Sequence, residues 1–374
     1  MLYCTHESAF GIPIFPKRSM QRGENMAGVT YKCPNCGAYL TFDPDSQQWK
    51  CPFCSSAFPE TELKGKAEAF QKEADKEAEQ SSGAQVVYHC PSCGSEIMTD
   101  ETTVATHCYY CHSPVVLQGK LTADMKPDEV LPFTIGREKA IEEISEWIRT
   151  RKFVPKKFFS KAQIQEMSGV YYPHFVSECQ TEGVLDGEAT TSDVFDEGKY
   201  VVTNTRHYHV RREGRFVFKD ILRPALSKAN RKLTEGVHPF PLEDAKPFSG
   251  AFLSGFLAER RDLEADSYRQ EIEQELQGYM NSMLRDTASQ YQTCSANTTA
   301  AVKKIKTKYV LLPTWVLTYP NKKNKDEPYY YVMNGCTGQV CGKLPVDQGR
   351  LWRHGLLAGL IVAALYCVLA YFLF

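Results

Sequence analysis

Four C-x-x-C pairs, arranged as two copies of one pattern, constrain this 374-residue chain more than any other feature. The segments 31–58 and 88–115 align without a gap, and every cysteine of the first has a counterpart in the second at one constant offset. An internal repeat of this kind indicates one structural unit used twice. The cysteines of the first copy are Cys33, Cys36, Cys51 and Cys54, and their counterparts in the second are Cys90, Cys93, Cys108 and Cys111.

The spacing predicts two metal sites, each made of four thiolates. A gap of 14 residues separates the two pairs of each copy, which suits a short hairpin that carries the second pair opposite the first. Zinc prefers four such soft ligands at tetrahedral corners. Segments this short bury too little apolar surface to fold alone, so metal binding must supply folding free energy. We expect two Zn²⁺ ions, one per copy, with an iron–sulfur cluster or disulfides as the alternatives.

The segment HCYYCH (107–112) permits a different interpretation, a redox dithiol. A thioredoxin-like C-x-x-C stands alone before a helix, whereas Cys108 and Cys111 have a partner pair and a sister copy. We therefore interpret them as metal ligands, and the flanking histidines as exposed bystanders. Tyr109 and Tyr110 lie at the turn between the two thiolates, and they are the residues that we predict to contact a protein partner.

Charge argues against nucleic acid. The chain has 44 basic and 45 acidic residues, and the segment 88–115 has no lysine or arginine at all. Binding to a phosphate backbone needs cations. Nucleic acid is therefore not the expected partner, although a nucleic-acid-binding ribbon protein without an ATPase remains the alternative function.

The C-terminal residues 355–374 are uncharged and apolar. Twenty residues of helix span about 30 Å, the thickness of a bilayer core. Lys343, Arg350 and Arg353 precede the segment and nothing basic follows it, so the positive-inside rule places the preceding chain in the cytoplasm. We predict a single-pass tail anchor in the cell membrane, with the N-terminal domains cytoplasmic.

Between the repeat and the apolar C-terminal segment, the pattern of residues 121–350 predicts a β-rich α+β domain. Helical spacing of apolar residues occurs in 137–153 and in a long segment, 259–289. Strand-like runs surround them, and RREG (211–214) has the composition of a hairpin turn. VYYPHFV (170–176) resembles VLLPTWV (310–316), which suggests two related halves, each with a proline that suits an edge or a bulge.

This body carries no motif of a known catalytic site, such as a G-x-S-x-G elbow, H-E-x-x-H or a dinucleotide fingerprint. His174, His207 and His209 are a weak candidate metal site, and we interpret them as structural or surface histidines. Cys336 and Cys341 are interpreted as free thiols rather than a redox pair. We therefore expect no enzymatic activity and no small-molecule substrate.

The fold class that follows is multidomain. RGENM (22–26) back-translates into a ribosome-binding site and a start codon, so we predict that Met26 is the start, with a disordered arm as the alternative. The predicted layout is a leader or arm (1–25), ribbon 1 (26–59), a charged helical linker (60–86), ribbon 2 (87–118), the β-rich domain (121–350) and the anchor (355–374).

Each cysteine copy resembles a zinc ribbon of the transcription-factor-IIB or rubredoxin-like type. Such ribbons also occur in the primosomal helicase, but this chain has no G-x-x-x-x-G-K-[ST] motif, so helicase activity is not expected.

The whole layout resembles the tail-anchored tandem zinc-ribbon membrane proteins of Gram-positive bacteria, one of which is encoded beside phage-shock protein A and a flotillin-like SPFH protein. The resemblance covers about residues 26–374 and rests on the ribbon pair, on PTWVLTY…YYYVMNGCTGQVCGKLP and on the terminal span. It implies a membrane adaptor that recruits stress-response proteins, such as phage-shock-protein-A-like or SPFH proteins.

Overall fold

The computed structural model describes residues 25–27, 31–63, 86–90, 96–99, 102–108, 114–117, 125–155, 167–227, 229, 231–319 and 329–373. Within these ranges the strands form one mixed ten-stranded sheet and two three-stranded sheets. The ten strands are β7 (Thr103–His107), β8 (Pro114–Val116), β9 (Glu129–Val130), β10 (Ser168–Glu197), β11 (Tyr200–Pro224), β12 (Lys246–Pro247), β13 (Leu257–Glu259), β14 (Thr293–Tyr319), β15 (Tyr329–Asn334) and β16 (Val340–Gly342).

The large sheet runs in the order β12-β9-β14-β10-β13-β7-β8, with β11 beside β10, and β15 and then β16 beside β14. The small sheets contain β1 (Asn25–Ala27), β5 (Val86–His89) and β6 (Glu96–Thr99) in one case, and β2 (Thr41–Asp43), β3 (Gln48–Lys50) and β4 (Ala57–Phe58) in the other. The helices are α2 (Arg137–Arg149), α4 (Arg231–Glu235), α5 (Arg269–Asp286) and α6 (Gln348–Leu373), and short 3-10 turns are η3 (Leu242–Asp244), η4 (Gly250–Leu253) and η5 (Ala265–Tyr268). The β-rich α+β body is thus confirmed.

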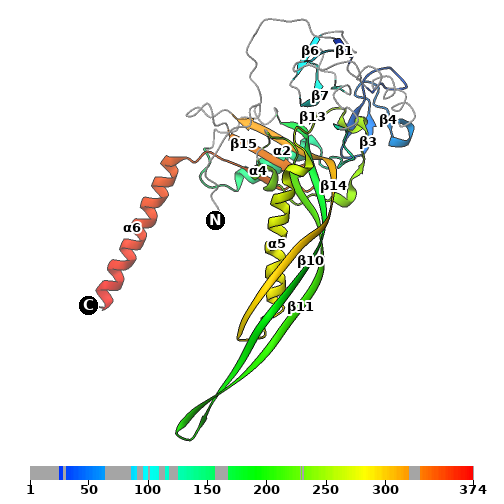
Figure 1. The fold of residues 1–374 in the computed structure, drawn as a ribbon. Helices are drawn as coiled ribbons and strands as arrows, with labels where there is room; N and C mark the ends of the chain where they lie inside the picture. Colours follow the sequence, from blue (N-terminus) through cyan, green and yellow to red (C-terminus); the bar gives the residue numbers. More distant parts are fainter. Residues whose placement is uncertain are drawn as a thin grey trace.

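Three strands are far longer than the usual five to six residues: β10 has 30 residues, β14 has 27 and β11 has 25. Their outer parts form a twisted arm that projects from the body, with α5 lying along it (Figure 1). The β10–β11 hairpin continues beyond the first residue of β14, which pairs with Thr190. We call this three-stranded projection with its helix the arm.

The two faces of the arm differ because side chains alternate along a strand. One face, with Leu185 and Ala189, packs against the buried row of α5, which is Ile272, Leu276, Met280 and Leu284. The opposite face carries cross-strand ion pairs, such as Arg211–Asp186 at 3.2 Å. Gly187 lies where β10 and β14 approach closely, because a Cβ there would overlap the carbonyl oxygen of Ser295.

The two related halves appear as a two-fold arrangement of strands around the β10–β14 pair. Val170 and Tyr171 pair in parallel with β13, and Val310 and Leu311 pair in parallel with β9, so the two echoed segments of the sequence make equivalent contacts. In order along the chain, β9-α2-β10-β11 is followed by β13-α5-β14-β15. The short first strand of each half, β9 or β13, therefore pairs with the long strand of the other half, β14 or β10.

Pro173 and Pro313 lie inside central strands rather than at a sheet edge, which differs from the expectation. Each stands at the point where its strand changes neighbour: β13 gives way to β11 beside Pro173, and β9 to β15 beside Pro313. Their carbonyl oxygens accept from the amides of Ala225 and Gly335, both at 2.9 Å. A proline has no N–H to donate, and it is tolerated here because one neighbouring strand has ended and the next has not yet begun to pair.

The predicted turn at 211–214 is wrong. β11 is continuous through RREG, and the hairpin turns instead between Glu197 and Tyr200, where Gly198 has a φ of +66°. Across the ladder, Arg211 and Arg215 each lie beside a carboxylate, Asp186 and Glu182. The expected helix 137–153 ends at Arg149, and the long helical segment begins with the 3-10 turn η5 before α5.

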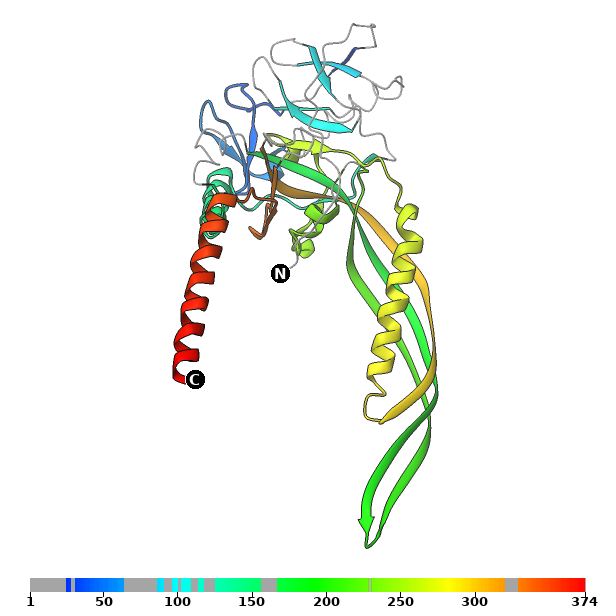
Figure 2. The ribbon, with the colours of Figure 1, turned by 90° about the vertical axis from the view of Figure 1, so that its left-hand side faces the viewer.

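The helix α6 stands apart from the body and points in the same general direction as the arm (Figure 2). Among the described residues it is the one helix long and apolar enough to cross a membrane, over Gln348–Leu369, and none of its apolar window is buried. The prediction of an apolar C-terminal helix is therefore confirmed.

Candidate metal centre

The first four cysteines lie on two tight turns that face each other. In the first turn, the amide of Gly37 donates to the carbonyl of Cys33 at 2.9 Å, and Gly37 has a φ of +75°, which a glycine adopts without strain. In the second, the amide of Ser55 donates to the carbonyl of Cys51 at 2.9 Å. The hairpin β2–β3 between them brings the turns together, as the spacing of the two cysteine pairs predicted.

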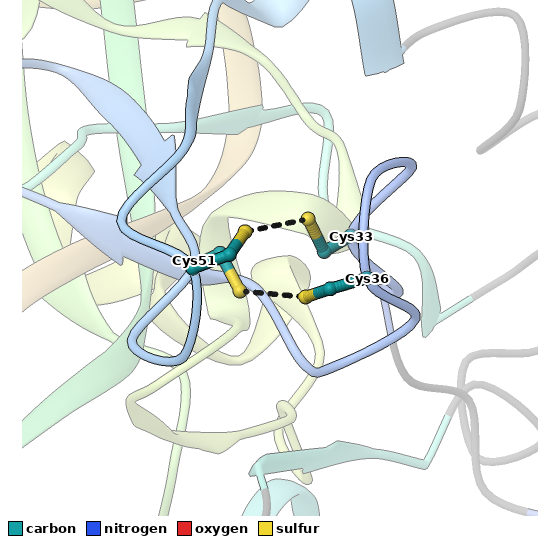
Figure 3. A group of neighbouring side chains, drawn as sticks. Cys33, Cys36 and Cys51 are labelled. Atoms are coloured by element: carbon teal, nitrogen blue, oxygen red, sulfur yellow. Dashed lines mark hydrogen bonds between the residues drawn. The ribbon is translucent and has the colours of Figure 1, made fainter.

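The four sulfur atoms form a compact group (Figure 3). The Sγ atoms of Cys33 and Cys54 are 3.6 Å apart, those of Cys36 and Cys51 are 3.5 Å apart, and all four lie within 4.8 Å of one another. These distances are too long for disulfide bonds. A tetrahedral zinc site with Zn–S bonds of about 2.3 Å has sulfur–sulfur edges of about 3.8 Å. The group therefore fits a metal ion of this size without rearrangement.

Local interactions make the four thiols unequal. Hydrogen bonds with Ser56 lower the pKa of Cys54 to about 6. The backbone of Ala38 acts to lower the pKa of Cys36, but desolvation and the neighbouring thiols outweigh it and raise that pKa to about 12. Four thiolates at these distances repel one another unless a cation lies among them. Metal binding would therefore release protons.

Ser56 and Asn35 support the sulfur group from outside, and sequence reasoning missed both. The Sγ of Cys54 lies 3.2 Å from the Ser56 hydroxyl, which also accepts from the Asn35 side-chain amide at 2.9 Å. This contact ties the first turn to the second. Asn35 sits between Cys33 and Cys36, and Ser56 follows Cys54 closely, so their place inside the repeat was the available signal.

The first cysteine copy, residues 31–58, packs against the β-rich body. Phe42 and Trp49 from its hairpin pack against Phe252 of η4, with ring centroids 5.3 and 5.1 Å from that of Phe252. Ser254 closes the contact, because its hydroxyl donates to the carbonyl of Leu40 at 2.5 Å and its own carbonyl accepts from Phe42 at 3.0 Å. Buried Cys33 and Cys51 belong to the same apolar cluster as Phe252.

Two strand pairings of the first copy recur in the second. Lys32 pairs with Tyr39 and Trp49 with Phe58. The equivalent residues of the second copy pair in the same way, His89 with Glu96 and Thr106 with Val115. Strand β7 of this copy also joins the large sheet through β13.

Burial follows the repeat as well. Cys90 and Cys108 are buried together, as are their counterparts Cys33 and Cys51. The predicted ligands Cys93 and Cys111 and the predicted contact residues Tyr109 and Tyr110 lie outside the described residues, so one four-cysteine group is observed among those described.

The weaker candidates of the body do not assemble into a site. His174 is buried near the base of β10, whereas His207 and His209 lie far along the exposed face of the arm, and His209 contacts Asp186 at 3.2 Å. The three histidines therefore do not share a metal. The Cys336 thiol donates to the carbonyl of Pro132 at 3.3 Å, and burial raises its pKa to about 12, as befits a structural thiol.

Taken together, the described residues define a β-rich α+β protein with a four-cysteine group that could hold a metal ion and an apolar C-terminal helix. The chain is similar to an uncharacterized protein of Bacillus subtilis strain 168, YdjG, with 27% identity over 338 residues, which are 90% of this chain and 96% of that protein. No protein-family model and no solved structure matches the chain. The similarity extends well beyond the cysteine repeat.

Proposed function

We propose that this protein is a membrane-anchored zinc-ribbon adaptor, without enzymatic activity, that presents its ribbons at the cytoplasmic face of the cell membrane to recruit other proteins. The observation that carries this proposal is the pairing of two features in one chain. A four-sulfur group is joined to the core of the body, and a separate helix carries an apolar window of which no part is buried. The core helix of a soluble protein would instead be covered by the rest of the chain.

The exposed turn of the first unit supports a role in protein contact. Phe53 lies between Cys51 and Cys54, and its side chain is 83% exposed. An aromatic ring so exposed on a metal-fixed turn is typical of a recognition residue, since aromatic residues are enriched at interfaces. Its equivalent in the second copy is Tyr110. The two turns would therefore present similar aromatic rings to partners such as phage-shock-protein-A-like or SPFH proteins.

The directions of α6 and the arm set one condition on anchoring. Both point the same way from the body (Figure 2), and the arm carries charged residues such as Arg211 and Asp186 that are costly to place in lipid. Insertion of α6 into a bilayer therefore requires a bend between the membrane-spanning part and the body, so that the arm stays in water.

The test is crosslinking and affinity capture of the full chain from native membranes. We expect one dominant protein partner to be captured by the wild type and lost when Phe53, Tyr109 and Tyr110 are changed to alanine. Tyr279→Ala is the matched control, because this tyrosine is 54% exposed on α5. Capture of the partner by the triple variant at the level of the Tyr279→Ala control would contradict the adaptor proposal. Tight binding of DNA by the purified chain that weakens steeply with salt would contradict it as well.

A further inference from the structure

Residues 347–354, at the start of α6, are held against the segment that follows α2. The backbone amide of Asp347 donates to the carbonyl of Phe153 at 2.7 Å, and the Arg350 guanidinium donates to the carbonyl of Val154 at 3.5 Å. The ring of His354 meets the ring of Phe153 edge to face, with centroids 5.5 Å apart. Residues 151–155 therefore lie beside the entrance to the apolar part of α6.

This segment is fixed to the body from behind. Val154 packs on the buried pair Leu317 and Tyr331, and so does Trp147 from the last turn of α2. The centroids of the Trp147 and Tyr331 rings are 5.7 Å apart. The Arg151 guanidinium lies over the Trp147 ring at 4.9 Å. The position of the segment beside α6 is thus set by core packing.

The same segment is strongly basic. Arg149, Arg151 and Lys152 are exposed, and Arg353 adds a fourth exposed cation from α6. The sequence RTRKFVPKK (149–157) holds five cations and no acidic residue, although its last two lysines lie outside the described residues. Two acids flank it: Asp347, which pairs with Arg350 at 3.6 Å, and Glu146 on the preceding turn of α2.

We propose that residues 149–154 and residues 350–354 at the start of α6 form a binding surface for anionic phospholipid headgroups, which we call the basic collar. The proposal rests on the proposed function, because it requires α6 to span the membrane. Cations held at the entry of a span lie within a Debye length of the lipid phosphates. Trp352, 70% exposed, faces solvent where an indole suits the interface. Continuity with the span favours lipid over an acidic protein as the occupant.

The bend required by the arm is compatible with this surface. The contacts between α6 and residues 153–154 end at His354, and Gly355 follows. Helices bend most readily at residues such as glycine. The span can therefore turn at Gly355 while residues 348–354 stay on the body and keep the basic collar at the membrane surface.

The experiment uses the full chain reconstituted into vesicles of equal parts phosphatidylcholine and phosphatidylglycerol. The protein is then extracted gently, and the retained lipid is counted by native mass spectrometry. One variant is Arg149→Gln/Arg151→Gln/Lys152→Gln. The control removes the same charge from the arm, with Lys303→Gln/Lys304→Gln/Lys306→Gln.

We expect wild type and the arm control to retain phosphatidylglycerol in clear excess. The triple collar variant should lose nearly all of this excess, since each cation near an anionic surface contributes on the order of 1 kcal/mol, or about five-fold. Insertion with no preference for phosphatidylglycerol, or an equal loss in both variants, would overturn the basic collar alone. A chain washed from the vesicles by alkaline carbonate would instead overturn the anchor, and the collar with it.

Discussion

Trp49 and Ala251 lie 202 residues apart in the chain, yet the indole Nε1 of Trp49 donates to the backbone carbonyl of Ala251 at 2.8 Å. Both groups are buried, and the indole packs on Phe252 beside them. The first cysteine copy, residues 31–58, and the β-rich body therefore share one core. Loss of structure in one should be felt in the other.

Trp49→Phe tests this coupling. The substitution keeps an aromatic ring but leaves the Ala251 carbonyl without its donor, which should lower the free energy of unfolding by about 1–3 kcal/mol. The four cysteines are untouched, so the metal content should not change. Thermal unfolding in detergent, followed by circular dichroism, measures the first quantity and elemental analysis the second. A chain that loses its metal at unchanged stability would show that the indole serves the sulfur group instead.

Metal content tests the two-site prediction. Purified full-length protein should contain two zinc ions, and Cys33→Ser and Cys90→Ser should each remove one, because a serine hydroxyl replaces a thiolate ligand poorly. Cys294→Ser is the control and should keep both ions, since this cysteine lies on the arm. Inductively coupled plasma mass spectrometry gives the count. One ion in the wild type would mean that the second copy folds without metal.

Removal of the metal should also destabilise the body. Structural zinc contributes about 10–16 kcal/mol in isolated zinc-finger peptides. Because Cys33 and Cys51 are buried in the same cluster as Phe252, a strong chelator should lower the unfolding temperature of the whole sheet. Differential scanning calorimetry with and without the chelator makes the comparison, and re-added zinc should restore the transition. An unchanged transition would show that the body is stable without its ribbon.

Two glycines of the arm should respond oppositely to alanine. A Cβ at Gly187 would overlap the backbone of Ser295, so Gly187→Ala should force β10 and β14 apart and cost about 1–3 kcal/mol. Gly278 lies inside α5, and an added Cβ there would have nothing within 4 Å, so Gly278→Ala should stabilise the helix by about 0.5–1 kcal/mol. Denaturant titration of both variants provides the measurement. Equal effects would contradict the close approach at Gly187.

Sequence patterns predicted the local parts of this structure well. The constant offset between the two copies indicated strand pairings that recur at equivalent positions, as Lys32–Tyr39 and His89–Glu96 show. The apolar helix was also predictable, since a long uncharged run needs no tertiary context. The echo between 170–176 and 310–316 pointed to the strand pair at the centre of the fold.

The parts that depend on distant contacts were not predictable in the same way. Glu213 and Gly214 have the composition of a turn, but both pair with β10, at Val184 and Gly183, in an unbroken ladder. The prolines suggested sheet edges because the sequence does not show where a neighbouring strand ends. Docking of Trp49 on η4 joins residues about half the chain apart, and no periodicity within either segment encodes it.

The buried His174 should make the stability of the protein depend on pH. Burial lowers the pKa of this imidazole to about 4, and its Nδ1 lies 3.2 Å from the carbonyl oxygen of Tyr172. An exposed histidine in the unfolded chain has a pKa of about 6.5. Between these values the unfolded state binds the proton and the folded state does not. The free energy of unfolding should therefore fall as pH drops from about 6.5 to 4, by about 3 kcal/mol in total from this group.

His174→Gln should remove this share of the pH dependence, because glutamine does not titrate. The informative quantity is the difference between variant and wild type at each pH, since protonation of the cysteine thiolates affects both chains alike. His209→Gln is the control, because it removes an imidazole that is exposed on the arm. Urea titrations at several pH values from 7 to 4 measure the slope. A His174→Gln chain that follows the wild-type slope would show that the imidazole is protonated in the folded state.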